Sequence, residues 1–166
     1  MPLRNFIKAY PESISDMLVA ADDRYQEAEE LLLQHKFDGC VYLLGYSAEM
    51  WLKVACLRLR SLGPNVQVKA ALGPLKSWMR QTAPQVPQAD FHDLAFLAAA
   101  VAQLRIHQGR PLPLPVATEL QSRVVNGLYP EWLVDMRYRR SGLAAVDAWA
   151  ALVNTWWLKQ NWMSLI

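Results

Sequence analysis

The stretch CVYLLGYSAEMWLKVACLRL, residues 40–59, decides the fold. Its apolar residues recur every three or four positions, which predicts one long helix with a wide buried face. Tyr42, Tyr46, Glu49 and Lys53 recur at the same spacing, so they line up along a second face of that helix. We expect a helix this apolar to be covered on more than one side by other helices.

The pair Glu49 and Lys53 within this stretch has two interpretations. On an exposed face, a glutamate four residues before a lysine adds about 0.3–0.5 kcal/mol to a helix. At a partly buried position, a carboxylate costs several kcal/mol unless a cation or hydrogen-bond donors satisfy it. Because the surrounding helix is nearly all apolar, we expect a cation to face Glu49.

The segment RYRR, residues 137–140, is a rich supply of cations. Arg137 and Arg140 share a face if the segment is helical, and arginine suits bidentate pairing with carboxylate or phosphate. One interpretation is a solvated helix end. The other is that Arg137 reaches Glu49, while Arg139 or Arg140 stays available for an anion.

The rest of the chain is also helical in pattern, and no stretch alternates long enough to predict a convincing strand. At 166 residues the chain has the size of one domain with one core, which we assign to residues 1–166. We expect Asp38 to cap the helix that contains residues 40–59, and that helix to end near Ser61. Further helices are expected from Ser13 or Ser15 to about Gln34, and over residues 75–80, 90–107, 116–126 and 144–162.

Composition narrows the class of protein. The chain is 53% hydrophobic and 19% charged with seven tryptophans, which indicates a large core or an apolar partner surface. A net charge of +2 creates no overall field toward nucleic acid, so any such contact must be local. Cys40 and Cys56 are expected to be core residues of a reduced, cytoplasmic protein.

Several kinds of site are not supported by the sequence. There is no phosphate-binding glycine loop, no GxSxG and no metal-ligand spacing of Cys and His, so we expect no cofactor and no metal. The apolar segment at residues 143–166 is interrupted by Asp147, Asn154 and Lys159 before it reaches the length of a membrane span. We therefore expect no membrane association.

Residues 28–59 resemble the first helix pair of HEPN domains, named from higher eukaryotes and prokaryotes nucleotide-binding. The family's G-Y-x-x-E-x-x-L-K-like signature is read here at Gly45, Tyr46, Glu49, Leu52 and Lys53. Two weaker similarities follow in family order, FHDLAFL at residues 91–97 and WLVDMRYR at residues 132–139. The resemblance implies an all-α, up-and-down bundle of four to five helices that forms a homodimer.

The resemblance also bears on function. Many HEPN domains are metal-independent ribonucleases whose signature is an Arg followed by a His, with four to six residues between them. Others bind nucleotides or partner a nucleotidyltransferase. This chain departs from the ribonuclease pattern, since its closest spacing is Arg105 to His107. A residue set remains that could gather at one end of the bundle, as a phosphate-binding site or as a polar network that fixes helix register: Tyr46, Glu49, Lys53, His92, Arg137, Tyr138 and Arg139.

From this we predict binding of a nucleotide or of RNA phosphate, in a prokaryotic toxin–antitoxin or defence system. Arg137, Arg139 and Lys53 would meet phosphate, and Glu49 would orient Arg137. One alternative is a divergent ribonuclease that uses His92 with Arg137. Another is a non-catalytic interaction module whose tryptophans dock a nucleotidyltransferase, an antitoxin or another chain.

Overall fold

The protein is an all-α bundle in a computed structural model that describes residues 13–86, 91–130, 132 and 142–166. All secondary-structure elements within these ranges are helices. A single isolated β-bridge joins Ser13 to Gln67. The elements are α1 (Ile14–Leu33), α2 (Phe37–Leu59), α3 (Val68–Thr82), α4 (Leu94–His107), α5 (Leu114–Glu119) with its π-helical continuation η2 (Leu120–Leu128), α6 (Ala145–Asn161) and the short 3₁₀ turn η4 (Trp162–Leu165).

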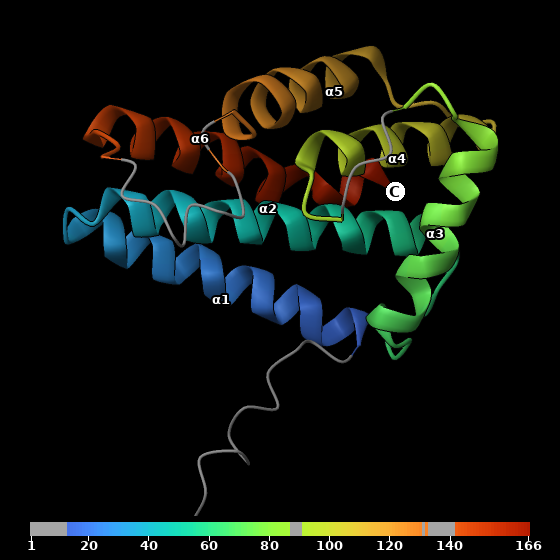
Figure 1. Ribbon diagram of the computed structural model, residues 1–166, viewed down its shortest axis with the longest axis horizontal. Helices are drawn as coiled ribbons and strands as arrows, with labels where there is room; N and C mark the ends of the chain where they lie inside the picture. The colour runs from blue at the N-terminus through green and yellow to red at the C-terminus, as the bar shows by residue number, and fades with distance from the viewer. Residues whose placement is uncertain (1–12, 87–90, 131, 133–141) are drawn as a thin grey trace, which may run out of the picture.

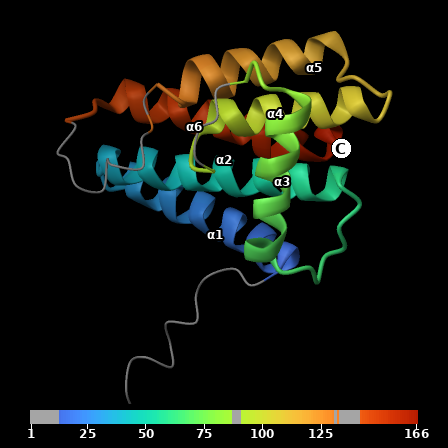
Figure 2. The same cartoon turned by 45° about the vertical axis from the view of Figure 1, so that its right-hand side comes forward.

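Helix α2 lies at the centre of the bundle (Figure 1). Helix α1 packs along one side of it, while α4 and α6 pack along the other and α3 stands across its C-terminal end. All residues of α2 from 47 to 57 are buried, which confirms that this helix is covered on more than one side. Figure 2 shows the α5 segment over α4 and α6, on the face away from α1.

Helix α2 is also long and apolar enough to cross a membrane, judged by length and composition alone. In its most apolar window, 83% of the residues are buried inside the bundle. A helix at the centre of a bundle is expected to be buried to this extent. A buried core helix can have the same length and composition as a membrane span, so length and composition do not distinguish the two.

Helix α1 begins at a Ser13 cap, which is one of the two starts that the sequence predicts. The Ser13 hydroxyl accepts from the Asp16 amide at 3.1 Å, and the Asp16 carboxylate accepts from the Ser13 amide at 3.1 Å. This reciprocal capping satisfies two of the amides that a helix start leaves without partners. Further along, the buried Ser47 hydroxyl donates to the Ala21 carbonyl at 2.9 Å and ties α1 to α2.

Four expected boundaries were wrong. Asp38 does not cap α2, because the helix starts one residue earlier and Asp38 instead accepts from the Leu143 amide at 3.0 Å. Helix α3 is longer than residues 75–80: its buried Val68, Ala71, Leu75 and Met79 continue the helical spacing through Pro74.

The other two corrections concern the second half of the chain. Helix α4 starts at Leu94 rather than Asp90, because the Asp93 carboxylate accepts from the Phe96 amide at 2.9 Å and caps it there. The helix expected over residues 116–126 begins at Leu114 and continues to Leu128, with its last nine residues π-helical.

Candidate ligand-binding site

The second face of α2 carries a buried ion pair. The Glu49 and Lys53 side chains are only 4% and 7% exposed, and the Lys53 ammonium donates to Glu49 Oε1 at 2.5 Å. The helix brings them together because residues four apart lie on the same face. The burial expected for Glu49 is confirmed, and Lys53 shares it.

His92 is the second partner of Glu49. It lies just before α4, and its Nδ1 is 2.9 Å from Glu49 Oε2. The imidazole is 43% exposed, so it connects the buried carboxylate to the surface. Both carboxylate oxygens of Glu49 therefore have a partner.

The expected arginine partner lies outside the described residues. Arg137, Tyr138, Arg139 and Arg140 all fall within residues 133–141, whose placement is not described. The pairing of Glu49 with Arg137 stays a prediction. Within the described ranges, the groups that hold the carboxylate are Lys53 and His92.

An open cavity lies over this cluster, between α1 and α2. Its volume is about 410 Å³. Its walls come from both helices and from His92, which precedes α4. The lining residues are Met17, Ala20, Arg24, Tyr42, Leu43, Tyr46, Glu49, Met50, Lys53 and His92. Most of this lining is apolar or aromatic, and one carboxylate, one ammonium and one imidazole converge within it.

The two tyrosines of the cavity are fixed by Trp132. Tyr42 and Tyr46 contact each other edge to face with ring centres 4.9 Å apart, and Tyr46 contacts the Trp132 ring in the same way at 5.7 Å. The indole N–H of Trp132 donates to the Tyr42 carbonyl at 3.0 Å. These contacts hold the rings in place without a ligand.

Gly45 is what lets Trp132 approach α2 this closely. A Cβ at position 45 would lie 2.0 Å from the Trp132 ring, a distance that no side chain can accept. Gly45, the first residue of the signature at residues 45–53, thus has a packing role. The sequence did not show this role, because Trp132 is far away along the chain.

Sequence reasoning found the polar part of the site and missed the rest. Tyr46, Glu49, Lys53 and His92 were expected, and the structure brings all four to one cavity. Arg24, Met17 and Ala20 were not expected, because they come from α1 and line the cavity only through the packing of α1 against α2. The sequence of α1 carries no local signal for this, because the packing of the two helices decides which of its residues border the cavity.

Among the described residues, no group of three or more His, Cys, Asp or Glu side chains is placed so that it could hold a metal ion. The chemistry of the cavity is that of a hydrogen-bonding pocket with aromatic walls. Buried Glu49 can accept from ligand N–H groups, and Lys53 has three N–H donors, of which Glu49 takes one.

Comparison of the chain with models of protein families, with curated proteins and with solved structures finds no match. The resemblance to HEPN domains therefore rests on the motif residues of α2 and the two shorter similarities alone.

Proposed function

We propose that the protein binds a nucleotide, or one nucleotide of an RNA, in the cavity between α1 and α2. The observation that supports this most is the cavity itself, whose apolar and aromatic walls surround the buried pair of Glu49 and Lys53 and the half-exposed His92. Its volume of about 410 Å³ falls in the usual range of small-molecule sites, about 300–1,000 Å³, which have the same mixture of apolar lining and few polar groups.

A nucleotide suits these walls for three reasons. A flat base can stack on Tyr42 or Tyr46, and base stacking on an aromatic side chain contributes about 1–3 kcal/mol. The Glu49 carboxylate can accept from the N–H groups of a base edge. Arg24 lies at the cavity with its side chain 45% exposed and paired with Glu27 at the surface, and its remaining N–H donors can meet a phosphate together with Lys53. Arg137 and Arg139 are the further phosphate contacts that we predict from the sequence.

The test is thermal unfolding with and without a panel of nucleotides and short RNAs. A ligand at 100 times its dissociation constant adds about 2.7 kcal/mol to stability. Ala20→Leu fills the cavity from α1 without touching the polar cluster, so we expect it to remove the shift and leave the unliganded protein folded. Ala150→Leu, at an exposed position of α6, is the matched control and should keep the shift. A shift of equal size in both variants would contradict this site.

A second candidate function, RNA cleavage, is favoured by the contact between Glu49 and His92. A carboxylate that accepts from Nδ1–H selects the tautomer whose lone pair is on Nε2, the form in which histidine acts as a general base. RNA cleavage that persists in EDTA and disappears in His92→Ala would support a divergent, metal-independent ribonuclease using His92 with Arg137. Intact RNA after prolonged incubation would exclude it.

A third candidate, the interaction module, is favoured by the outer face of α6. Five large apolar side chains on α6 and the turn after it are 50–70% exposed at roughly helical spacing: Val146, Trp149, Val153, Trp156 and Met163. Exposed apolar stripes of this kind mark partner surfaces. We propose a homodimer through this face, in a cytoplasmic protein, with a nucleotidyltransferase or an antitoxin as the other partner to be tested.

The oligomeric state tests this third candidate directly. We expect sedimentation equilibrium to give a dimer, and Trp149→Arg with Trp156→Arg to give a folded monomer. A monomeric wild-type protein at all concentrations would rule out the homodimer and leave the face to a different chain.

A further inference from the structure

The small net charge of the chain hides a strong separation of charge along it. Residues 13–49 contain eight acidic and two basic side chains, whereas residues 50–118 contain eight basic and two acidic ones. Helix α1 carries most of the first group, and the end of the bundle opposite the α1–α2 turn carries much of the second. One end of the molecule is therefore basic although the protein as a whole is nearly neutral.

We define the basic end by Arg58, Arg60, Arg105 and Arg110. Arg58 and Arg60 lie at the C-terminal end of α2, and Arg105 and Arg110 lie in and after the last turn of α4. Helix α3 crosses this end and adds Lys69, Lys76 and Arg80 along its length (Figure 1).

No carboxylate side chain neutralises the four arginines of the basic end within the described residues. Their hydrogen bonds go to neutral or main-chain oxygens: Arg58 to the Leu62 carbonyl at 3.3 Å, Arg60 to the Ala71 carbonyl at 3.4 Å, Arg105 to the Ile166 main-chain oxygen at 2.7 Å, and Arg110 to the Gln108 side chain at 3.1 Å. A guanidinium has five N–H donors, so each arginine keeps donors for a ligand.

Helix capping accounts for only part of this arrangement. A cation near a helix C-terminus gains about 0.3–1 kcal/mol from the helix dipole, and that explains one arginine at the end of α2 and one at the end of α4. It also accounts for Arg80 in the last turn of α3, but not for a further arginine at each of the first two helix ends, nor for Lys69 and Lys76 of α3.

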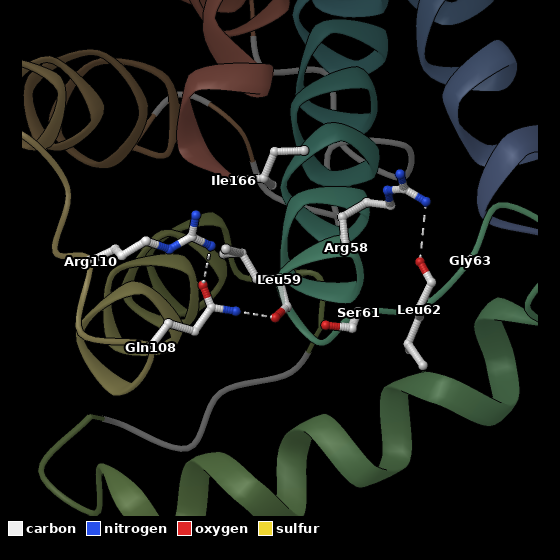
Figure 3. Close-up of a pocket in the computed structure, with 8 residues that line it drawn as sticks. All are labelled: Arg58, Leu59, Ser61, Leu62, Gly63, Gln108, Arg110 and Ile166. Atoms are coloured by element: carbon white, nitrogen blue, oxygen red, sulfur yellow. Dashed lines mark hydrogen bonds between the residues drawn. The ribbon is translucent and has the colours of Figure 1, made fainter.

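A cavity at this end of the bundle includes two of these arginines in its lining. It has a volume of about 410 Å³ and lies where α2 and α4 end, with Arg58 turned toward Leu62 and Arg110 held by Gln108 (Figure 3). The Gln108 amide donates to the Leu59 carbonyl and its oxygen accepts from Arg110, so Gln108 fixes the position of Arg110 beside the cavity. Ser61 adds an exposed hydroxyl to the lining.

We infer that the basic end binds the phosphate backbone of a single-stranded nucleic acid, with a separate phosphate at each of Arg58, Arg60, Arg105 and Arg110. Arginine outnumbers lysine here, and its planar fork suits phosphate oxygens. This inference deepens the proposed function, on which it rests: it makes the ligand a polynucleotide that contacts the protein beyond the α1–α2 cavity. Protein surfaces that follow a single strand without reading its sequence use positive grooves of this kind.

The test is fluorescence anisotropy of a labelled oligouridylate of about twelve nucleotides, measured at several salt concentrations. For single strands the slope of log K against log salt is about −0.7 for each phosphate contact. Four contacts predict a loss of about 50-fold between 50 and 200 mM salt. Arg58→Ala with Arg110→Ala should reduce that loss to about 7-fold and weaken binding at every salt concentration.

Two controls separate this inference from the proposed function. Arg123→Ala removes an arginine that is already paired with Glu119 in the π-helical segment, and it should bind the oligonucleotide as the wild-type protein does. The thermal shift caused by a mononucleotide should survive in the Arg58 and Arg110 double variant, because its α1–α2 cavity is intact. Loss of oligonucleotide binding with that shift retained supports the basic end.

Other outcomes overturn the inference. Unchanged oligonucleotide binding and salt slope in the double variant would show that the backbone does not contact Arg58 and Arg110. Competition by polyglutamate as strong as competition by the unlabelled oligonucleotide would make the partner an acidic protein surface rather than a nucleic acid. A mononucleotide shift that fails while oligonucleotide binding persists would instead remove the α1–α2 cavity as a nucleotide site.

Discussion

Replacing Lys53 by methionine should strongly lower the free energy of unfolding, although the new side chain fits the same space in α2. The methionine occupies a similar volume, but it leaves the Glu49 carboxylate at 4% exposure without its ammonium partner. Breaking a buried pair by removing one member costs about 3–5 kcal/mol. His92 can offset part of this cost, because its Nδ1 stays within 2.9 Å of the carboxylate.

A double-mutant cycle separates the interaction between Glu49 and Lys53 from the cost of burying each charge. Glu49→Gln leaves Lys53 as an unpaired buried cation and should cost a similar amount. The double variant Glu49→Gln with Lys53→Met contains no buried charge from either residue, so it should be more stable than the two single costs would predict together. We expect the coupling free energy to be about 1–3 kcal/mol, as found for residues in direct contact.

The assay is urea unfolding followed by circular dichroism, with the free energy of unfolding taken from midpoint and slope. Arg123→Met is the matched control: Arg123 pairs with Glu119 at the same spacing of four residues, but with side chains 32% and 45% exposed. Its cost should stay below about 1 kcal/mol. A Lys53→Met cost as small as that of the control, with no coupling to Glu49, would refute the buried-pair reasoning.

Three further changes test the packing, the capping and the thiols. Gly45→Ala should destabilise the protein by about 3 kcal/mol or more in urea unfolding, because its Cβ would lie 2.0 Å from Trp132. Gly63→Ala, with nothing within 4 Å of the new atom, should change little. Asp93→Ala removes the α4 cap and also the acceptor of the Tyr129 hydroxyl at 3.0 Å, so it should cost about 2 kcal/mol by the same measurement, and a neutral result would contradict both contacts. Burial raises the pKa of the Cys56 thiol from 9.0 to about 12, so the unfolded chain ionises first. Stability should therefore be intact below pH 9.0 and should fall by about 1.4 kcal/mol per unit from there to about 12. Cys56→Ala should remove that part of the pH slope, and an unchanged slope would show that another group causes it.

The helical pattern was sufficient to predict the all-α bundle, a serine cap at Ser13 or Ser15, and the stripe of Tyr46, Glu49 and Lys53. These features depend on residues three or four apart, which the sequence places directly. His92 was expected in the same set as Glu49, but the direct contact between them was not predicted, since the two residues are 43 positions apart and meet only when α4 packs against α2. Glycine and proline at positions 73 and 74 led to too short an α3, although the apolar spacing on both sides of them was unbroken.

The charge separation was missed for a different reason. Net charge adds the acidic residues of α1 to the basic residues of the following segment, and the sum of +2 conceals both. Counting charge within each expected helix would have found the basic end from the sequence. Its cavity, lined by Arg58 and Arg110, could not have been found this way, because it depends on α2 and α4 ending side by side.

Stability alone does not account for charged groups at the centre of this bundle. A buried ion pair often contributes no more than well-packed apolar side chains of the same volume, and can contribute less. Ser47 and Thr155, the other buried polar residues of the described chain, satisfy themselves on main-chain carbonyls within the bundle. Glu49 and Lys53 differ from them because they border a cavity and connect through His92 to the surface. A pair needed only to fix helix register would gain nothing from that opening, whereas a ligand site requires it, and this difference favours binding over a purely structural network.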